Sequence, residues 1–361
     1  MPSVSFNGQS FIIDGRRQWI LAASLQYARI APEHWQRRIA DAAQAGFNTI
    51  ETACPWMLHE PRPGRFTFEG PADLPHVLQL CHEAGMRVIL RPGPYIGCGF
   101  DGGGLPAWLT DDPAMPLRQP DERFLERAGA YLRRLANTIG DFQASRGGPI
   151  LLVQIEHQLT CGNEEAVETY MRDLSRILRE SGVNVPLINT NDLWTDPVDT
   201  IDTWRGSRDL LVELRQLRAI QPHASRAVHV HDGRPPIIRG EQPGEPRTPE
   251  MLIQQIAEVL AAGAQPIVSP FHGGTNFGFA GGRYAGRENG GLATTSAAAH
   301  PPLGEAGLRS AQYMALKRIC TFAKNFGHVF ADLDPDYQPV TLDPIPIDHD
   351  APKGGRGGKS K

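Results

Sequence analysis

The sequence has few cysteines, no long apolar run and no excess of charge of either sign. Its five cysteines among 361 residues form no Cys-x-x-Cys pair and no cluster with histidine, so we expect neither a disulfide framework nor a structural zinc site. No stretch approaches the roughly 18 apolar residues of a membrane span. The 36 basic and 40 acidic residues give a net charge of −4, which argues against a nucleic acid partner.

The sequence also lacks the marks of targeting and of cofactor binding. The first residues, Met1 to Phe6, contain no basic segment followed by an apolar run, so we expect no signal peptide, no membrane partner and a cytoplasmic location. No Gly-x-Gly-x-x-Gly turn follows the first predicted strand, which removes the usual mark of a dinucleotide-binding sheet. We therefore predict no cofactor and no metal. The oligomeric state is unknown from these features.

Short apolar runs alternate with helical patterns over most of the chain. The predicted strands are 19–25, 47–52, 87–91, 149–156, 186–190, 200–204, 236–241 and 265–272. The predicted helices are 32–45, 73–84, 121–139, 164–181, 208–220, 249–262 and 308–326. In the fourth helix, Val167, Met171, Leu174 and Leu178 recur at steps of three and four residues, which is typical of one buried helix face.

This alternation predicts an α/β fold with parallel strands, closed either as a doubly wound sheet or as a (β/α)8 barrel. Polar and glycine-rich segments directly follow several strands, at 51–63, 92–106, 156–163 and 272–283. In a barrel these loops share one face, the face that carries barrel chemistry. We therefore predict a single-domain (β/α)8 TIM barrel over residues 1–335. An extended tail follows at 336–361, and its Gly- and Lys-rich end is expected to be disordered.

Two predicted strands end in residues able to do acid/base chemistry. Glu241 closes the run 236–241, where a barrel places nucleophiles and bases, although a structural carboxylate paired with Arg239 is the alternative. Glu156, His157 and Gln158 follow the run 149–155. Strand alternation places Glu156 and Gln158 on one side and His157 on the other, unless the strand end twists. These three residues are candidates for catalysis, or for a hydrogen-bonded polar plug at the barrel mouth.

Aromatic and glycine-rich segments supply further candidates. Trp56 follows the run 47–52 and is a possible sugar-stacking platform, although packing at the loop base is the common role of such a residue. The segment from Phe271 to Gly278 contains His272 and Asn276 between glycines that permit tight turns near a site. It lacks the lysine and the spacing of a phosphate-binding loop.

Five blocks, in order between about residues 8 and 325, make the sequence recognisable. They are Pro55-Trp56 with Leu58-His59-Glu60-Pro61, Arg91-Pro92-Gly93-Pro94-Tyr95-Ile96, Gly103-Gly104-Leu105-Pro106-Ala107-Trp108-Leu109, Gly147-Gly148-Pro149-Ile150, and Phe271-His272-Gly273-Gly274-Thr275-Asn276-Phe277-Gly278. Together they resemble the catalytic barrel of glycoside hydrolase family 35, the β-galactosidase family. The resemblance implies a retaining exo-glycosidase that acts on terminal β-galactosides and binds a carbohydrate. Retention uses two carboxylates about 5–5.5 Å apart.

The resemblance places the family nucleophile at Glu241 but finds the acid/base position changed. The family motif Gln-Val-Glu-Asn-Glu-Tyr-Gly appears here as Gln154-Ile155-Glu156-His157-Gln158-Leu159-Thr160, so the acid/base glutamate has become Gln158. The Asn before it has become His157, and Glu156 is the possible alternative acid.

Several sugar-contacting positions of the family also differ. Ala53 stands in place of the family tyrosine, and Gly99 in place of the glutamate of a Cys-Ala-Glu-Trp-Asp motif. The aromatic pattern after the nucleophile is replaced by Gln242-Pro243-Gly244-Glu245. The family tyrosines near 297–299 are alanines. The full set of substrate-binding positions carried over is His157, Trp56, Tyr95, Gly99, Ala53, Gln242, His272 and Asn276.

An amide cannot protonate a leaving group, and general acid catalysis typically contributes about 10²–10⁴-fold. The sequence therefore predicts a family 35 barrel impaired in ordinary β-galactoside hydrolysis. One alternative is an active retaining glycosidase with an acidic leaving group, or with Glu156 as the acid after burial raises its pKa. Another is a non-catalytic glycan-binding or interaction module. These alternatives differ in whether the chain is an enzyme, and the sequence does not decide between them.

Overall fold

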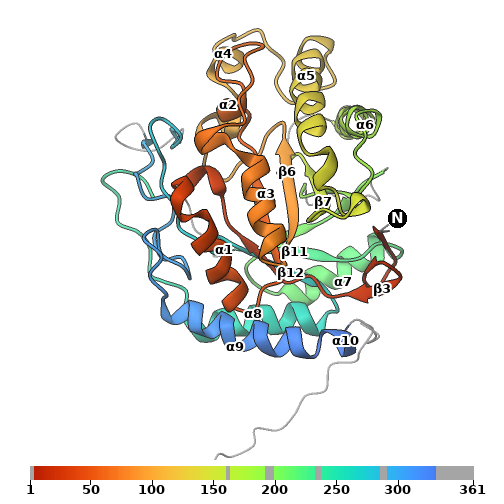
Figure 1. Ribbon diagram of the computed structural model, residues 1–361, viewed down its shortest axis with the longest axis vertical. Helices are drawn as coiled ribbons and strands as arrows, with labels where there is room; N and C mark the ends of the chain where they lie inside the picture. Colours follow the sequence, from red (N-terminus) through yellow and green to blue (C-terminus); the bar gives the residue numbers. More distant parts are fainter. Residues whose placement is uncertain (1–3, 160–162, 192–198, 232–236, 285–290, 331–361) are drawn as a thin grey trace, which may run out of the picture.

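The computed structural model describes residues 4–159, 163–191, 199–231, 237–284 and 291–330. The predicted tail at 336–361 lies outside the described residues. Figure 1 shows the helices arranged around a central group of strands, as the alternating sequence pattern predicts.

The central sheet is parallel and closes almost completely. Its strand order is β10-β11-β12-β4-β5-β6-β7-β8-β9. The strands are β4 (Ala22–Ser24), β5 (Thr49–Ala53), β6 (Arg87–Gly93), β7 (Ile150–Ile155), β8 (Leu187–Asn189), β9 (Ile201–Asp202), β10 (Trp204–Gly206), β11 (Ala227–His231) and β12 (Gln265–Ser269).

Strands β9 and β10 are two halves of one bent strand that is interrupted at Thr203. The first half pairs with β8 and the second with β11. Counted together, these halves occupy one position, and the ring then has the eight positions of a TIM barrel. The predicted (β/α)8 barrel is confirmed.

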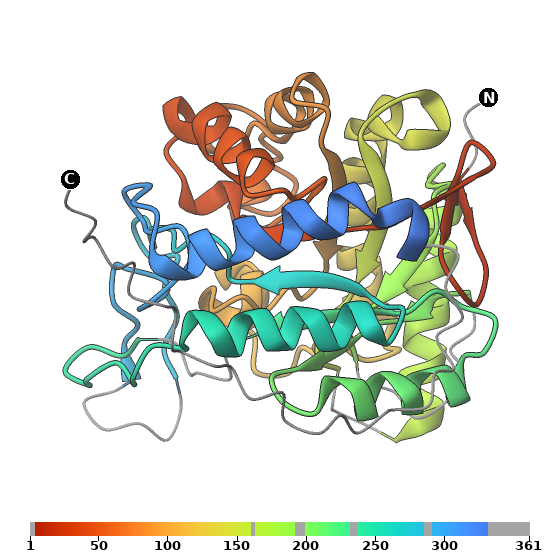
Figure 2. The same cartoon turned by 90° about the horizontal axis from the view of Figure 1, so that it is seen from below.

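The helices cover the outside of the ring. The longer ones are α1 (Trp35–Gln44), α3 (Leu74–Glu83), α5 (Glu122–Thr138), α6 (Glu164–Glu180), α7 (Leu210–Ile220), α8 (Pro249–Ala261) and α9 (Ala311–Asn325). The shorter ones are α2 (Trp56–His59), α4 (Ala107–Thr110) and α10 (Gly327–Phe330), with 3₁₀ turns at Tyr27–Arg29, Pro32–His34, Gly70–Ala72, Asp101–Gly104, Gly140–Phe142 and Ala144–Arg146. Figure 2 shows α8 and α9 running side by side.

Side-chain caps explain why the predicted helix starts are close to the observed ones. Asp73, Asp121, Asn163 and Thr248 each accept a hydrogen bond from a backbone N–H of the first turn of the following helix. Ser310 does the same for α9. Each cap satisfies an N–H group that the helix itself leaves without a partner, which stabilises the start by about 1 kcal/mol.

A small antiparallel sheet closes the barrel at the amino ends of its strands. It consists of β1 (Val4–Phe6), β2 (Phe11–Ile13) and β3 (Arg16–Gln18). Phe11 and Ile13 are buried against the side chains that fill the lower barrel interior, including Ile89, Leu152 and Ile267. These apolar side chains fill the amino end of the barrel, so a pocket can form only at the opposite, carboxyl end.

The predicted strand at 236–241 is wrong for the residues that the structure describes. Ile238 makes one isolated antiparallel bridge to Ala293, and a turn with Gly240 at a φ of 86° follows. The barrel position is taken by β11, which pairs with β10 and β12. Strand β11 alternates buried valines with two histidines. The histidines lower its hydrophobicity, which is why an apolar-run criterion overlooks it.

We predict that Gly46 cannot be replaced by alanine without a large loss of stability. Gly46 follows α1 at a φ of 90°, and an added Cβ would lie 2.7 Å from the backbone nitrogen of Thr321. Gly182 follows α6 at a φ of 89° with nothing within 4 Å of the added atom, so it is the matched control. Gly182→Ala should cost about 1–2 kcal/mol of unfolding free energy from backbone strain alone, and Gly46→Ala at least about 2 kcal/mol more. Urea unfolding measures both, and equal costs would contradict the prediction.

Candidate active site

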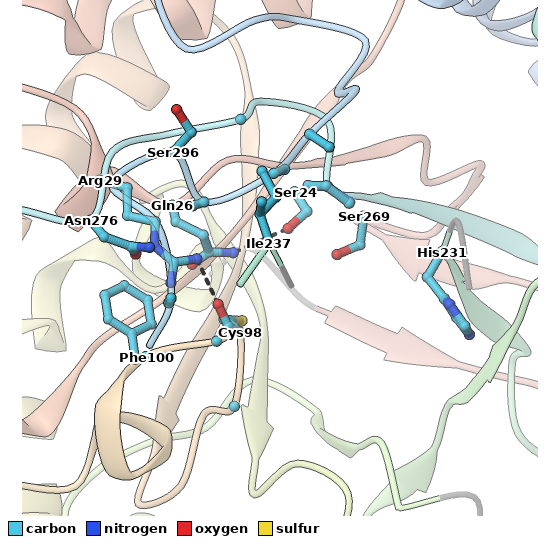
Figure 3. A pocket seen from close by; sticks show the side chains of 18 of the residues that line it. Ser24, Gln26, Arg29, Cys98, Phe100, His231, Ile237, Ser269, Asn276 and Ser296 are labelled. Carbon is cyan, nitrogen blue, oxygen red and sulfur yellow. Dashed lines mark hydrogen bonds between the residues drawn. The ribbon is translucent and has the colours of Figure 1, made fainter. Parts of the chain in front are cut away.

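A cavity of about 540 Å³ opens at the carboxyl ends of the barrel strands. Its walls come from the ends of β4, β10, β11 and β12 and from the loops that follow β6, β7, β11 and β12. Figure 3 shows Arg29 and Asn276 together on one side of this pocket, with His231 on the far side of the view. The pocket therefore lies where barrel enzymes place their chemistry.

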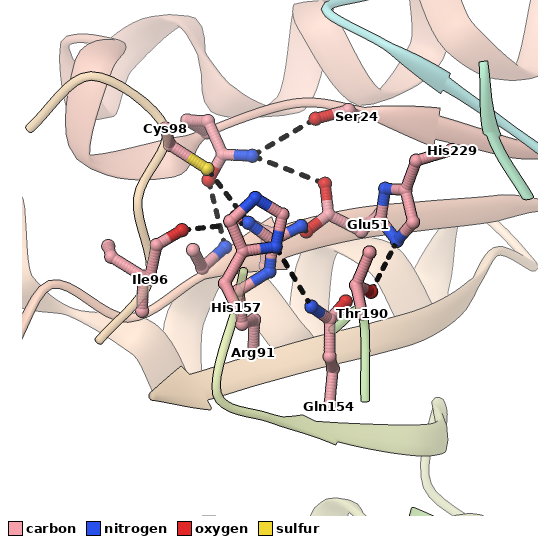
Figure 4. Close-up of polar contacts among 12 residues, drawn as sticks. Ser24, Glu51, Arg91, Ile96, Cys98, Gln154, His157, Thr190 and His229 are labelled. Atoms are coloured by element: carbon pink, nitrogen blue, oxygen red, sulfur yellow. Dashed lines mark hydrogen bonds and ion pairs between the residues drawn. The ribbon is translucent and has the colours of Figure 1, made fainter. Parts of the chain in front are cut away.

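A buried ion pair forms the base of the pocket. Arg91 Nη2 on β6 lies 2.7 Å from Glu51 Oε1 on β5, and the two side chains are only 2% and 0% exposed. Arg91 also donates to the Ile96 carbonyl and to Cys98 Sγ (Figure 4). Gln26 donates to the other Glu51 oxygen. The charge of Arg91 is thus balanced by a carboxylate of the protein itself.

The backbone turns sharply where β7 ends, and this turn decides which side chains enter the pocket. Glu156 has a φ of 59° and Gln158 a φ of 51°. Such left-handed conformations are uncommon for non-glycine residues and break the alternation of a strand. His157 and Gln158 consequently both line the pocket. The strand end therefore twists, which is the exception that the sequence prediction allowed, and the alternation that would separate His157 from Gln158 does not hold.

Glu156 is held in a buried network away from the pocket lining. Its Oε2 lies 2.8 Å from Arg118 Nη2, and its Oε1 accepts a hydrogen bond of 2.7 Å from the Tyr170 hydroxyl. The same Oε2 also accepts from the backbone N–H of His157. Both oxygens of this carboxylate are thus used by donors of the protein, and Glu156 does not line the cavity. The geometry thus gives no support to Glu156 as a proton donor.

His157 and His229 face one another at the base of the pocket, with ring centroids 6.3 Å apart. Gln154 Nε2 lies 3.4 Å from His157 Nδ1, and Thr190 Oγ1 lies 3.2 Å from His229 Nε2 (Figure 4). Burial, with Arg91 as the next contributor, holds the pKa of both imidazoles well below the usual value of 6.5. Both rings are therefore neutral at pH 7 and serve as hydrogen-bonding groups rather than as cations.

Glu241 and Gln242 line the pocket from the loop after β11, and Glu241 is exposed. Glu241 does not end a barrel strand, because β11 ends at His231, whose side chain lines the pocket at that position. Among the described residues that line the cavity, Glu241 is the single carboxylate. It shares the cavity with Gln158, as the sequence predicts.

The other predicted sugar-binding residues divide into two groups. Tyr95, Gly99, His272 and Asn276 line the pocket. Ala53 and Trp56 are buried outside its lining.

The indole of Trp56 is occupied by protein neighbours. It stacks on Tyr131 with ring centroids 4.9 Å apart and donates to Glu60 at 2.6 Å. The structure places Trp56 in the core, where it packs the base of a loop, which is the alternative that its sequence context allowed.

Arg29 is a pocket residue that the sequence reasoning missed. It is 7% exposed, it donates from Nη1 to the Cys98 carbonyl at 2.6 Å, and its guanidinium lies over the Phe100 ring (Figure 3). Burial lowers its pKa from the usual value. Its position in the 3₁₀ turn after β4 is the one available signal, because that segment is a barrel-mouth loop. Arg205 on β10 adds a further guanidinium to the lining.

Within the described part of the chain, no group of three His, Cys, Asp or Glu side chains is arranged to hold a metal ion. The helices of that part include none long and apolar enough to cross a membrane.

The family model for glycosyl hydrolases family 35 matches residues 10–323. The chain belongs to this family. It is thus a β-galactosidase-like member of the glycoside hydrolases, in agreement with the barrel and with the motif blocks that surround the pocket.

Curated relatives and solved structures agree with this assignment. Beta-galactosidase-1-like protein 2 of Homo sapiens is 32% identical over 282 residues, which are 75% of this chain and 43% of that protein. Beta-galactosidase of Homo sapiens is 31% identical over 347 residues, or 88% of this chain and 48% of that protein. The chain thus spans about half the length of these relatives. A beta-galactosidase structure from Marinomonas ef1 shares the fold, with a TM-score of 0.61, 11% identity and coverage of 87% of this chain and 62% of that one.

We predict that the buried histidines make the fold sensitive to mild acid. The pKa of His229 is below 6.5 in the folded state and returns to about 6.5 on unfolding, so the unfolded chain binds more protons as pH falls through 6.5. Stability is therefore lost on acidification, and His229→Asn should lessen this loss by up to about 1.4 kcal/mol per pH unit between about pH 6 and about pH 5. Urea unfolding at each pH measures the slope. His223→Asn, at an exposed loop position, is the control, and equal slopes for the two variants would contradict the prediction.

Proposed function

We propose that this chain is a family 35 barrel that binds a carbohydrate in the pocket and hydrolyses ordinary β-galactosides only very slowly. The observation that carries the proposal is the composition of the pocket lining. Gln158 and Glu241 line the same cavity, and Glu241 is the single carboxylate among the described lining residues. Retaining hydrolysis needs a second carboxyl group to protonate the leaving oxygen.

The nearby acidic side chains do not replace the missing proton donor. Glu51 is paired with Arg91, and Glu156 is paired with Arg118. Glu305 accepts hydrogen bonds from the hydroxyls of Thr275 and Ser296. Each of these carboxylates therefore has an ion-pair or hydrogen-bond partner within the protein. An amide at position 158 can orient a hydroxyl group or water, but it cannot supply a proton.

A carbohydrate ligand is supported by the form and polarity of the pocket as well as by family membership. The cavity of about 540 Å³ is lined by hydrogen-bonding groups such as Gln26, His157 and Asn276 together with the ring of Tyr95. This mixture of polar groups and an aromatic surface suits a sugar, which presents hydroxyls at its rim and C–H groups on its faces. The binding role is thus retained in a site that lacks a complete catalytic pair.

The loss of general acid catalysis leads to a direct prediction about activity. Replacing Gln158→Glu restores a carboxyl group at the position, so kcat/KM on a nitrophenyl β-galactoside should rise at least about 10-fold. A steady-state assay of released nitrophenol measures this change. Gln242→Glu adds a carboxylate elsewhere on the pocket wall and is the matched control, with no comparable gain expected.

Two results would contradict the proposal. Robust turnover of the nitrophenyl β-galactoside by the unaltered chain, lost in Glu241→Gln, would show a working retaining enzyme. Rapid turnover of a glycoside with a very acidic leaving group, together with a covalent adduct on Glu241 trapped by the corresponding 2-fluoro glycoside, would favour a glycosidase that needs no proton donor.

A further inference from the structure

We propose that the sugar bound in this pocket carries a carboxylate, as a hexuronic acid does, and that Arg29 and Tyr284 receive it above Gly99. The inference rests on the proposed function, because it names the class of carbohydrate for the same pocket. The charges of the cavity lining are its first support. Three arginines, Arg29, Arg91 and Arg205, line the cavity against the single described carboxylate Glu241.

Arg29 and Arg91 differ in how their charges are balanced. Arg91 forms an ion pair with Glu51, and both side chains are buried, so the charge of Arg91 is neutralised by the protein. Arg29 is also buried, at 7% exposure, but no carboxylate of the described chain contacts it. Its hydrogen bond goes to a backbone carbonyl, and its face lies 4.0 Å from the centroid of the Phe100 ring. A buried guanidinium without a counter-ion is costly, and an anionic ligand would remove that cost.

Arg29 and Tyr284 both lie close to Gly99, a residue without a side chain. A Cβ atom placed on Gly99 would be 3.7 Å from Arg29 Nη2 and 2.8 Å from the Tyr284 hydroxyl. A side chain at position 99 would collide with the Tyr284 hydroxyl, so the glycine lets these two donors from distant parts of the chain face the same part of the cavity. Gly99 and both donor residues line the cavity. Burial raises the pKa of Tyr284, so its hydroxyl keeps its proton and can donate.

Two buried polar atoms near this part of the pocket have no hydrogen-bond partner within the described chain. Arg29 donates from Nη1 to Cys98, whereas the buried Arg29 Nε has no hydrogen-bond partner. Asn276 Oδ1, on the same side of the pocket in Figure 3, is buried without a donor as well. A carboxylate accepts from a guanidinium and a phenol, and an adjacent ring hydroxyl donates to an amide oxygen. A uronic acid presents both groups on one ring.

The first test compares acidic and neutral sugars of the same ring configuration. Titration calorimetry of the unaltered chain with D-galacturonate and D-galactose, and with D-glucuronate and D-glucose, measures the preference. We expect at least one acid to bind 10-fold or more tightly than its neutral partner, because charge-assisted hydrogen bonds are about twice as strong as neutral ones. Equal binding of acid and neutral forms would overturn this inference and leave the proposed function standing. Binding of none of the four sugars would overturn both.

The second test compares a charged and a neutral side chain of nearly the same size at position 99, within the proposed carboxylate site. Gly99→Asp puts a carboxylate next to Arg29 and Tyr284, and Gly99→Asn puts an amide of nearly the same shape there. Both residues tolerate the φ of 68° at this position better than most, and in both the new Cβ requires the same displacement of the Tyr284 hydroxyl, from which it would lie 2.8 Å. We expect the aspartate variant to bind the acidic sugar at least 10-fold more weakly than the asparagine variant. Equal affinities would place the anion elsewhere and overturn the inference.

The third test removes the guanidinium. Arg29→Gln should abolish the preference for the acidic sugar over its neutral partner, and Arg172→Gln, at an exposed surface ion pair, should leave the preference unchanged. Circular dichroism establishes that each variant is folded. If Arg29→Gln does not fold, the comparison of the Gly99 pair still decides. A preserved preference in folded Arg29→Gln would overturn the assignment of Arg29.

Discussion

The ion pair between Glu51 and Arg91 is the interaction on which the pocket depends. It joins neighbouring strands β5 and β6 below the cavity, and both side chains are almost completely buried. Gln26 extends the network to the segment after β4, and the Ile96 carbonyl and Cys98 extend it to the loop after β6. Because each partner satisfies the other, neither charge is available to a ligand. The strand ends and two loops are instead fixed relative to one another, which keeps the remaining lining residues in place.

The acidic side chains near the pocket share one pattern, which is pairing with the protein itself. Glu51 and Glu156 each contact an arginine, and Glu305 accepts from hydroxyls of the loop after β12. The arginines are not all engaged in the same way, since Arg29 has only a carbonyl and an aromatic ring. The pocket lining therefore contains three arginines, while the carboxylates around it other than Glu241 are paired with groups of the protein. This asymmetry links the weak hydrolysis that we propose to the charged ligand that we infer.

The fold could be predicted from the sequence more fully than the site. Caps such as Asp73 and Asn163 and the periodic apolar stripes act locally, so they identify helices without knowledge of distant residues. Strand β11 was not predicted, because its two histidines belong to the pocket side of the strand and hide the buried valines.

The orientation of the residues after β7 depends on backbone angles that no sequence pattern encodes. The left-handed conformation at Glu156 directs this carboxylate into the network with Arg118 and brings His157 into the cavity. The grouping of Arg29, Gly99 and Tyr284 joins segments far apart in the chain, so only the folded barrel reveals it. By contrast, the shared cavity of Gln158 and Glu241 was predicted, because both were assigned to the barrel mouth.

The apolar seal at the amino end of the barrel has a consequence for the shape of any glycan that this chain accepts. Phe11 and Ile13 close the interior opposite the mouth, together with Ile89 and Ile267. In the described part of the chain, the cavity is thus a blind well. A polysaccharide cannot pass through a cavity that is open at one end only, so only a chain terminus or a short side branch fits inside. It must also leave through the same opening by which it entered.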